Sequence, residues 1–193
     1  EIEGELKYAV RRQEETIYHK RLRLANPEMA RFKDLILYNL EAGEAVLTDN
    51  NDIRIYTDGK AKFRALIEEM RQARRYIHVQ YYIIRNDELW GEIEKVLIEK
   101  SREGVEVRVL FDSMGCRTMK DKDWERLEKE GIMVAEFFPA LLGQLQLRVN
   151  YRNHRKIVVI DGRIGFVGGF NVGREYLGRD KKFGYWRDTH LCI

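Results

Sequence analysis

Apolar residues first recur along this chain at helical spacing. They do so in two runs, over residues 6–17 and 29–40. Asn26 and Pro27 lie between the runs, and we expect them to be the cap and the first residue of the second helix. The pattern therefore predicts an N-terminal helical extension over residues 1–44.

From residue 45 onward, short stretches rich in β-branched and aromatic residues alternate with amphipathic runs. Thr57 or Asp58 can cap the first of these helices, and Asn86 or Asp87 the second. This order predicts an α/β fold over residues 45–193, a mixed β-sheet flanked by helices, with ligand groups at the carboxyl ends of strands. The predicted strands are 53–56, 76–84, 105–111, 132–137, 155–160, 163–167 and 185–193.

Residues 137–149 interrupt this alternation. They are apolar without a clear period, which favours a buried loop over the alternative of a lipid-facing rim. No internal repeat and no low-complexity segment is evident.

Charge is unevenly distributed along the chain. The 193 residues contain 35 Lys and Arg against 32 Asp and Glu, a net charge of +3. Residues 143–193 alone hold ten basic and four acidic side chains. Such a block favours a surface that handles anions, with an ordinary solvated face as the alternative.

The composition also excludes several classes of protein. Cys116 and Cys192 lack CxxC spacing, and the four histidines show no zinc pattern, so we expect reduced thiols and no metal site. No stretch reaches the roughly 18–20 apolar residues that cross a bilayer. The chain starts with neither a signal peptide nor an initiator residue, so we expect a soluble piece of a longer protein.

The candidate chemistry lies in the segment 150–171. Two predicted strands flank Asp161 and Gly162, a dipeptide that suits a type I′ hairpin turn. His154 and Lys156 are two residues apart and therefore share one face, whereas Asp161 has the opposite parity. We therefore expect the imidazole and the ammonium to converge on one site and Asp161 to be structural.

Gly168, Gly169 and Asn171 follow this hairpin. The glycine pair would let the backbone approach a ligand closely, and we expect Asn171 near the start of a short helix whose N–H groups favour an anion. Together with His154 and Lys156, these groups suit covalent cleavage of a phosphate diester. A second proton donor for the leaving alcohol is not evident in the sequence.

The motif His154-x-Lys156-x4-Asp161, followed by Gly168-Gly169-x-Asn171, resembles the HKD signature of the phospholipase D superfamily. Other segments narrow the resemblance to bacterial cardiolipin synthases, from about residue 45 to the end. These segments are 81–87, 137–139, 150–156 and 184–190.

The resemblance implies a role for each residue of the motif. His154 would be one of two reactive histidines, Lys156 and Asn171 would bind the phosphate, and the Gly168-Gly169 backbone would join the same cradle. Asp161 belongs to the signature. In this family a carboxylate from the strand after the motif usually accepts a hydrogen bond from the histidine, and Asp188 is our candidate for it. The chemistry needs no metal and no cofactor.

In this family two HKD halves form one active site. The resemblance therefore implies the first half of a phosphatidyltransferase that acts on phosphatidylglycerol, with a missing C-terminal HKD half as partner and little turnover alone. It also implies an anionic membrane surface and a bacterial cell membrane, with the catalytic domain on the cytoplasmic side. A nucleic-acid partner is disfavoured. The alternatives are a one-motif phosphodiesterase or nuclease that acts as a homodimer, and a phosphate- or lipid-binding module.

Three further polar residues stand where a pocket could recruit them. His78 and Asp112 lie on predicted strands, and His190 shares parity with Asp188. Because such residues are more often structural, we expect each to be hydrogen-bonded in the packing rather than catalytic.

Overall fold

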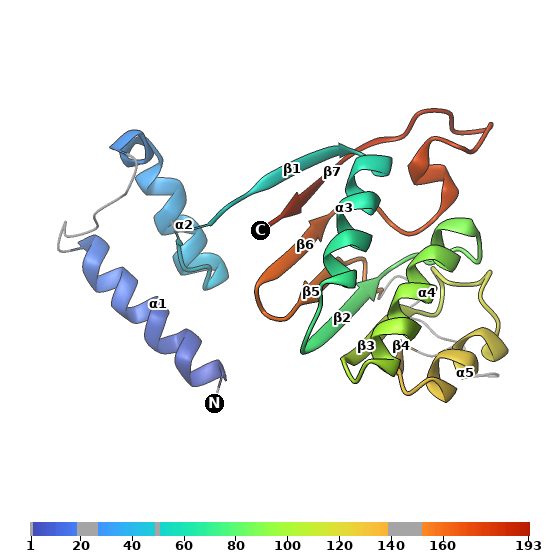
Figure 1. Ribbon diagram of the computed structural model, residues 1–193. Helices are drawn as coiled ribbons and strands as arrows, with labels where there is room; N and C mark the ends of the chain where they lie inside the picture. Colours follow the sequence, from blue (N-terminus) through green and yellow to red (C-terminus); the bar gives the residue numbers. More distant parts are fainter. Residues whose placement is uncertain (1, 19–26, 49–50, 139–151) are drawn as a thin grey trace, which may run out of the picture. The chain divides into compact units, whose positions relative to one another are not determined.

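The predicted N-terminal helices are present in the computed structural model, which describes residues 2–18, 27–48, 51–138 and 152–193 (Figure 1). Residues Glu1–Asp52 form one unit and Ile53–Ile193 another. The boundary predicted after residue 44 therefore lies within the first unit's range, and Asn26 lies outside the described residues. The elements of the first unit are α1 (Ile2–Tyr18), the 3-10 helix η1 (Pro27–Phe32) and α2 (Lys33–Gly43).

The second unit is built on a seven-stranded sheet in the order β1-β7-β6-β5-β2-β3-β4. Strands β2, β3 and β4 run parallel, and the other neighbours are antiparallel, so the sheet is mixed as predicted. The strands are β1 (Arg54–Asp58), β2 (Tyr76–Tyr81), β3 (Glu106–Asp112), β4 (Met133–Phe137), β5 (Lys156–Ile160), β6 (Ile164–Gly168) and β7 (Arg187–Cys192).

Strand β2 is shorter than the stretch 76–84 predicted for it. After Tyr81 the chain leaves β5, and Ile84 forms a parallel bridge with Val172 instead. This change of partner brings the segment after β2 against the segment after β6, where the HKD-like motif ends.

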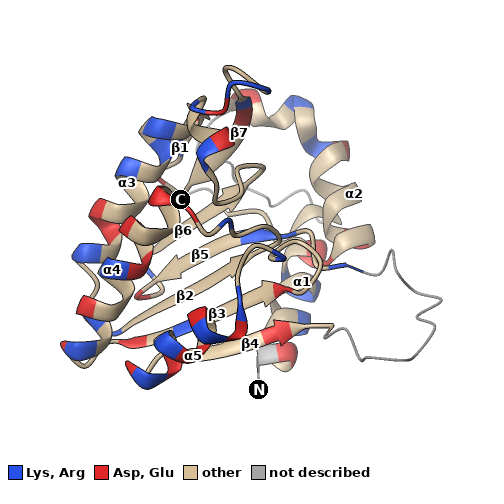
Figure 2. Cartoon of the chain, turned by 90° about the vertical axis from the view of Figure 1, so that its right-hand side faces the viewer, with Lys and Arg blue, Asp and Glu red and all other residues tan. Residues whose placement is uncertain are grey.

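Three helices of the second unit pack against one face of the sheet: α3 (Gly59–Arg71), α4 (Glu88–Arg102) and α5 (Asp121–Lys129). Asp58 and Asp87 cap α3 and α4 through backbone N–H groups, as two of the predicted alternatives. Figure 2 shows the positions of Lys and Arg (blue) and of Asp and Glu (red) along the ribbons of these helices. No described helix is long and apolar enough to cross a membrane.

The opposite face of the sheet carries a row of side chains that are half-buried or exposed. Neighbouring strands pair Gln80 with Ile157, Ile157 with Val167, Val167 with Leu191, and Leu191 with Ile55. Val167 is 40% exposed and Ile55 is 67% exposed. Four of these five side chains are apolar, so this face offers an apolar stripe to a partner.

The hairpin between β5 and β6 has the predicted turn. Asp161 and Gly162 both have positive φ, 57° and 67°, which is the backbone of a type I′ turn. The carboxylate of Asp161 accepts hydrogen bonds from the backbone N–H groups of Arg74, Arg75 and Tyr76, at 2.9, 2.8 and 3.0 Å. Asp161 therefore holds the far end of the hairpin to the start of β2, the structural role predicted from its parity.

Candidate active site

His154 and Lys156 lie together, as the spacing predicts. The Lys156 Nζ is 2.9 Å from the imidazole Nδ1 and 2.6 Å from the His154 carbonyl oxygen. Lys156 opens β5 directly opposite Tyr81, the last residue of β2. The pair therefore sits at the carboxyl edge of β2, where the fold class places ligand groups.

The surroundings of this pair favour uncharged forms. Burial lowers the pKa of His154, the Lys156 ammonium lowers it further, and the charge of Asp112 opposes both. Burial also lowers the pKa of Lys156 to about 8, against the opposing charge of Asp188. The ring of Tyr82 packs on the imidazole with a centroid separation of 4.5 Å. An anionic phosphate would reverse these shifts by restoring charge balance.

Asp188 does not hold the imidazole in this arrangement. Among the described residues no hydrogen bond joins it to His154, and its carboxylate accepts from the Thr189 backbone at 2.7 Å and the Trp186 indole at 3.5 Å. Its charge acts instead on Lys156. The hydrogen bond predicted between Asp188 and His154 is therefore absent among the described residues.

The glycine pair makes its close approach to β7. A Cβ on Gly168 would lie 2.5 Å from the His190 Cα, and one on Gly169 would lie 1.9 Å from the Asp188 Oδ1. The Gly169 N–H donates to the Thr189 carbonyl at 2.8 Å. Strand packing therefore explains why both positions lack a side chain, and whether the same backbone cradles a phosphate stays a prediction.

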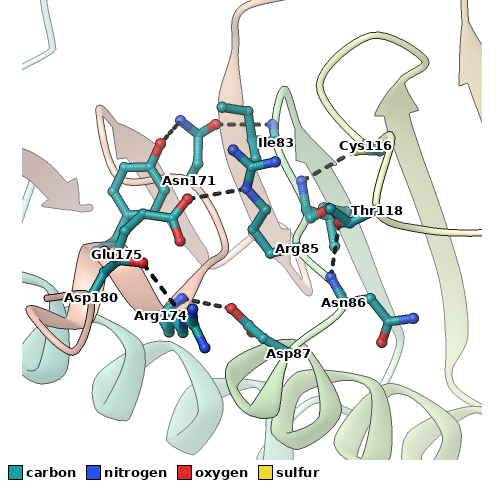
Figure 3. Close-up of polar contacts among 12 residues, drawn as sticks. Ile83, Arg85, Asn86, Asp87, Cys116, Thr118, Asn171, Arg174, Glu175 and Asp180 are labelled. Carbon is teal, nitrogen blue, oxygen red and sulfur yellow. Dashed lines mark hydrogen bonds and ion pairs between the residues drawn. The ribbon is translucent and has the colours of Figure 1, made fainter. Parts of the chain in front are cut away.

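The oxygen and the nitrogen of the Asn171 side-chain amide each form a hydrogen bond within the protein (Figure 3). Its Oδ1 accepts from the Ile83 N–H at 3.1 Å, and its Nδ2 donates to the Tyr176 hydroxyl at 2.9 Å. The expected helix is only the 3-10 turn η2 (Arg174–Leu177), which begins after Gly173. A short helix therefore does start near Asn171, whereas anion binding at that start stays a prediction, and one amide hydrogen of Asn171 is left for a ligand.

Figure 3 also shows the polar contacts between the segment after β2 and the 3-10 turn η2. Arg85 pairs with Glu175 at 3.2 Å, and the carboxylate of Asp87 accepts from the Arg174 backbone at 2.7 Å. These contacts hold the segment after β2 to η2. They make the position of Asn171 rigid, because both of its partners belong to these two segments.

The other histidines do not supply a second reactive imidazole within the described part of the chain. His78 pairs with Glu106 at 2.9 Å, and His190 is fully buried. Both ring nitrogens of His190 lack a hydrogen-bond partner, so the hydrogen-bonded packing expected for it is wrong. His19 and residues 139–149 of the predicted apolar loop lie outside the described residues.

Two residues near His154 were not assigned to the site from the sequence. Tyr82 follows β2, and Asp112 ends β3 with only 1% of its surface exposed. Both residues lie at the carboxyl ends of parallel strands, where ligand groups are expected. The sequence predicts this position, but a tyrosine and an aspartate there do not by themselves indicate a catalytic site. In the described ranges, no cluster of three or more His, Cys, Asp or Glu is arranged to hold a metal ion.

Comparison with known proteins decides the family. The family described as "Cardiolipin synthase, PLD-like domain" matches residues 66–183. The chain belongs to this phospholipase D-like family. It is 52% identical over 167 residues to a cardiolipin synthase of Oceanobacillus iheyensis, which covers 86% of this chain and 35% of the relative. A cardiolipin synthase of Staphylococcus aureus is 53% identical over 169 residues, 88% of this chain and 34% of the relative.

The family's fold also agrees with solved structures. NucT from Helicobacter pylori matches with a TM-score of 0.54 and 16% identity, over 73% of this chain and 84% of the other. A phosphatidylserine synthase from Haemophilus influenzae matches with a TM-score of 0.55 and 18% identity, over 73% of this chain and 32% of the other. The phospholipase D-like α/β fold predicted from the sequence is therefore confirmed. The chain spans about a third of the length of the cardiolipin synthases that it matches.

Proposed function

We propose that this chain is the first catalytic half of a cardiolipin synthase, which transfers a phosphatidyl group between two phosphatidylglycerol molecules. The observation that carries the proposal is the direct contact of His154 with Lys156, in a chain that is 52% identical to a cardiolipin synthase. A nucleophilic imidazole beside an ammonium is the arrangement that covalent phosphodiester chemistry requires.

In the proposed reaction, His154 is one of two reactive histidines, of which one is the nucleophile and the other is general acid and then general base. The imidazole that acts as nucleophile forms a nitrogen–phosphorus bond while the bond from phosphorus to the leaving glycerol oxygen breaks. The other imidazole gives that oxygen a proton. In the second step it takes a proton from the attacking glycerol hydroxyl, whose oxygen bonds to phosphorus as the nitrogen–phosphorus bond breaks. Lys156 and the free amide hydrogen of Asn171 bind the nonbridging oxygens, and Asp188 compensates the charge of Lys156. No metal or cofactor takes part in this proposal.

The second imidazole would come from a C-terminal half with its own HKD motif. Support comes from the absence of a suitable second histidine in the described residues and from the share of about a third that the chain covers in its relatives. The apolar stripe through Ile157 and Val167 is an available surface for that half. The proposal places the whole protein at the anionic surface of a bacterial membrane, with this domain on the cytoplasmic side.

Complementation tests the proposal. The chain is mixed with the separately expressed C-terminal part of the Staphylococcus aureus relative, and cardiolipin formation from phosphatidylglycerol vesicles is measured. We expect little product from either part alone, product from the mixture, and none with His154→Ala. A His154→Ala mixture that makes as much cardiolipin as wild type would overturn the proposal.

Oligomeric state separates this proposal from its alternatives. A dimeric chain that cuts DNA in a His154-dependent and salt-dependent way would favour the one-motif nuclease. Robust cardiolipin formation by the chain as a demonstrated monomer would show that no second half is needed. Binding to phosphatidylglycerol vesicles without any histidine-dependent phosphoenzyme in the mixture would favour a binding module.

A further inference from the structure

Asp112 is a buried carboxylate at the end of β3, and its hydrogen-bond donors are backbone N–H groups. Its Oδ1 accepts from Met114 at 2.9 Å and from Gly115 at 3.3 Å, in the turn that follows the strand. Its Oδ2 accepts from Asn153 at 3.1 Å. Burying a carboxylate so deeply that 1% of the residue is exposed costs free energy. The hydrogen bonds from the backbone N–H groups offset part of that cost.

The bond to Asn153 joins residues that are far apart in the sequence. Asn153 directly precedes His154, and its own side chain accepts from the Arg155 N–H at 3.4 Å. On the other side of the histidine, Lys156 is fixed by its pairing with Tyr81 in the sheet. The backbone of His154 is therefore held between two anchors, one of which is the carboxylate of Asp112.

The same carboxylate lies close enough to act on the imidazole by its charge. The Lys156 ammonium and the Tyr82 ring contact His154, and the charge of Asp112 acts on it. Of these, only Asp112 favours a protonated ring, because Lys156 and burial oppose it. When a histidine becomes protonated during proton transfer, a nearby negative charge stabilises the protonated ring.

We propose that Asp112 is a positioning residue for His154, fixing the backbone that carries it and stabilising its protonated ring. The reaction that this serves rests on the proposed function, but the effect on the ring belongs to this chain alone. It differs from the role predicted for Asp188, whose charge acts on the Lys156 ammonium and which has no hydrogen bond to the imidazole among the described residues.

Asp161 provides a matched control for this role. Its carboxylate also accepts three backbone N–H groups, and it stands at the other end of the same strand β5. Asp161→Asn and Asp112→Asn therefore remove similar hydrogen bonds and similar charge. The two variants differ in burial, because Asp161 is only half-buried whereas Asp112 is buried, and in position, because only Asp112 is hydrogen-bonded to the residue beside His154.

The test is a pH titration of the histidine rings by NMR on the 193-residue chain, with His154 assigned from a His154→Gln variant. We expect Asp112→Asn to lower the pKa of His154 and Asp161→Asn to leave it unchanged, while both variants lower the unfolding midpoint. An unchanged pKa of His154 in folded Asp112→Asn would overturn the proposal. So would an equal decrease of that pKa in both variants.

A second measurement needs no variant and covers the case in which Asp112→Asn does not fold. The carboxyl carbon of Asp112 is followed by 13C NMR in the wild-type chain across the titration of His154. Because a nearby carboxyl carbon responds to the change in charge of the ring, we expect its chemical shift to show an inflection at the pKa of His154. Its absence would overturn the electrostatic part of the proposal, and neither measurement depends on phosphatidyl transfer.

Discussion

Gly168 lies directly opposite His190 in the ladder between β6 and β7, and the imidazole occupies the space above the glycine. A Cβ on Gly168 would come within 2.7 Å of the His190 Cγ as well as 2.5 Å of the Thr189 carbonyl oxygen. On the other side of β6, Val167 pairs with Ile157, the residue that follows Lys156 in β5. Strands β6 and β7 can therefore approach each other at Gly168 only because this residue has no side chain.

Gly168→Ala should therefore destabilise the second unit. The new methyl group meets backbone atoms that cannot move aside without shifting β7, so we expect a loss of about 1–3 kcal/mol. Gly165→Ala is the matched control in the same strand, because nothing lies within 4 Å of its added Cβ, and a change within about 0.5 kcal/mol is expected. Urea unfolding followed by tryptophan fluorescence checks both, and equal losses in the two variants would contradict the packing argument.

His190 should make the protein sensitive to mild acid. Burial, with the charges of Lys62 and Lys156, lowers the pKa of His190 to about 3. Below a pH of about 6.5 this histidine is protonated in the unfolded chain but stays neutral in the folded chain. The free energy of unfolding therefore falls as pH falls. The loss between pH 7 and pH 5 should be about 2 kcal/mol from this group. His190→Leu should remove it, and a variant that loses as much stability as wild type over this range would exclude the effect.

The buried pair of Lys62 and Tyr81 should cost stability at neutral pH. Lys62 is fully buried, its Nζ donates to the Tyr81 hydroxyl at 2.7 Å, and burial lowers its pKa well below the usual range. Because the folded chain holds this proton less tightly than the unfolded chain, stability rises as pH rises toward about 10.4, where the unfolded chain also releases the proton.

A double-mutant cycle isolates this pair. Lys62→Met alone leaves the Tyr81 hydroxyl without its partner, and Tyr81→Phe alone leaves the amine without one, a cost of about 1–3 kcal/mol in either case. The double variant removes both groups and should be more stable than either single variant at pH 7, with a weaker pH dependence. The three tryptophans, Trp90, Trp124 and Trp186, all lie in the second unit and report its unfolding. Additive single effects would show that the pair is not coupled.

The elements of the second unit were predictable because their signals are local. Asp58 and Asp87 cap helices three or fewer residues away, and Asp161 with Gly162 forms a turn that needs only the two residues themselves. The same holds for His154 and Lys156, whose common direction follows from strand geometry.

The parts that were predicted wrongly depend on which strands become neighbours. Asn171 bonds to Ile83, a residue 88 positions away, and no pattern in either segment indicates that contact. His190 is buried, yet both of its ring nitrogens lack a hydrogen-bond partner, and its ring stacks on that of Phe170 at a centroid separation of 6.1 Å. These contacts depend on which strands lie side by side in the sheet. The alternation of apolar residues along the sequence does not indicate that order.

The charge of Lys156 should control anion binding in the slightly alkaline range. With a pKa of about 8, this ammonium is mostly protonated at pH 7 and mostly neutral at pH 9. Since the charged form binds the phosphate, affinity for a diester should fall about tenfold between these two values. Dimethyl phosphate is a suitable probe because its own charge is constant over this range, and the shifts of backbone amide signals report its binding.

Two variants of Lys156 separate charge from shape in this measurement. Lys156→Arg keeps a permanent charge, so its affinity for dimethyl phosphate should stay constant from pH 7 to pH 9. Lys156→Met should bind weakly at both values. An affinity that falls equally in wild type and in Lys156→Arg would assign the pH dependence to another group, and a constant wild-type affinity would contradict the lowered pKa of Lys156 itself.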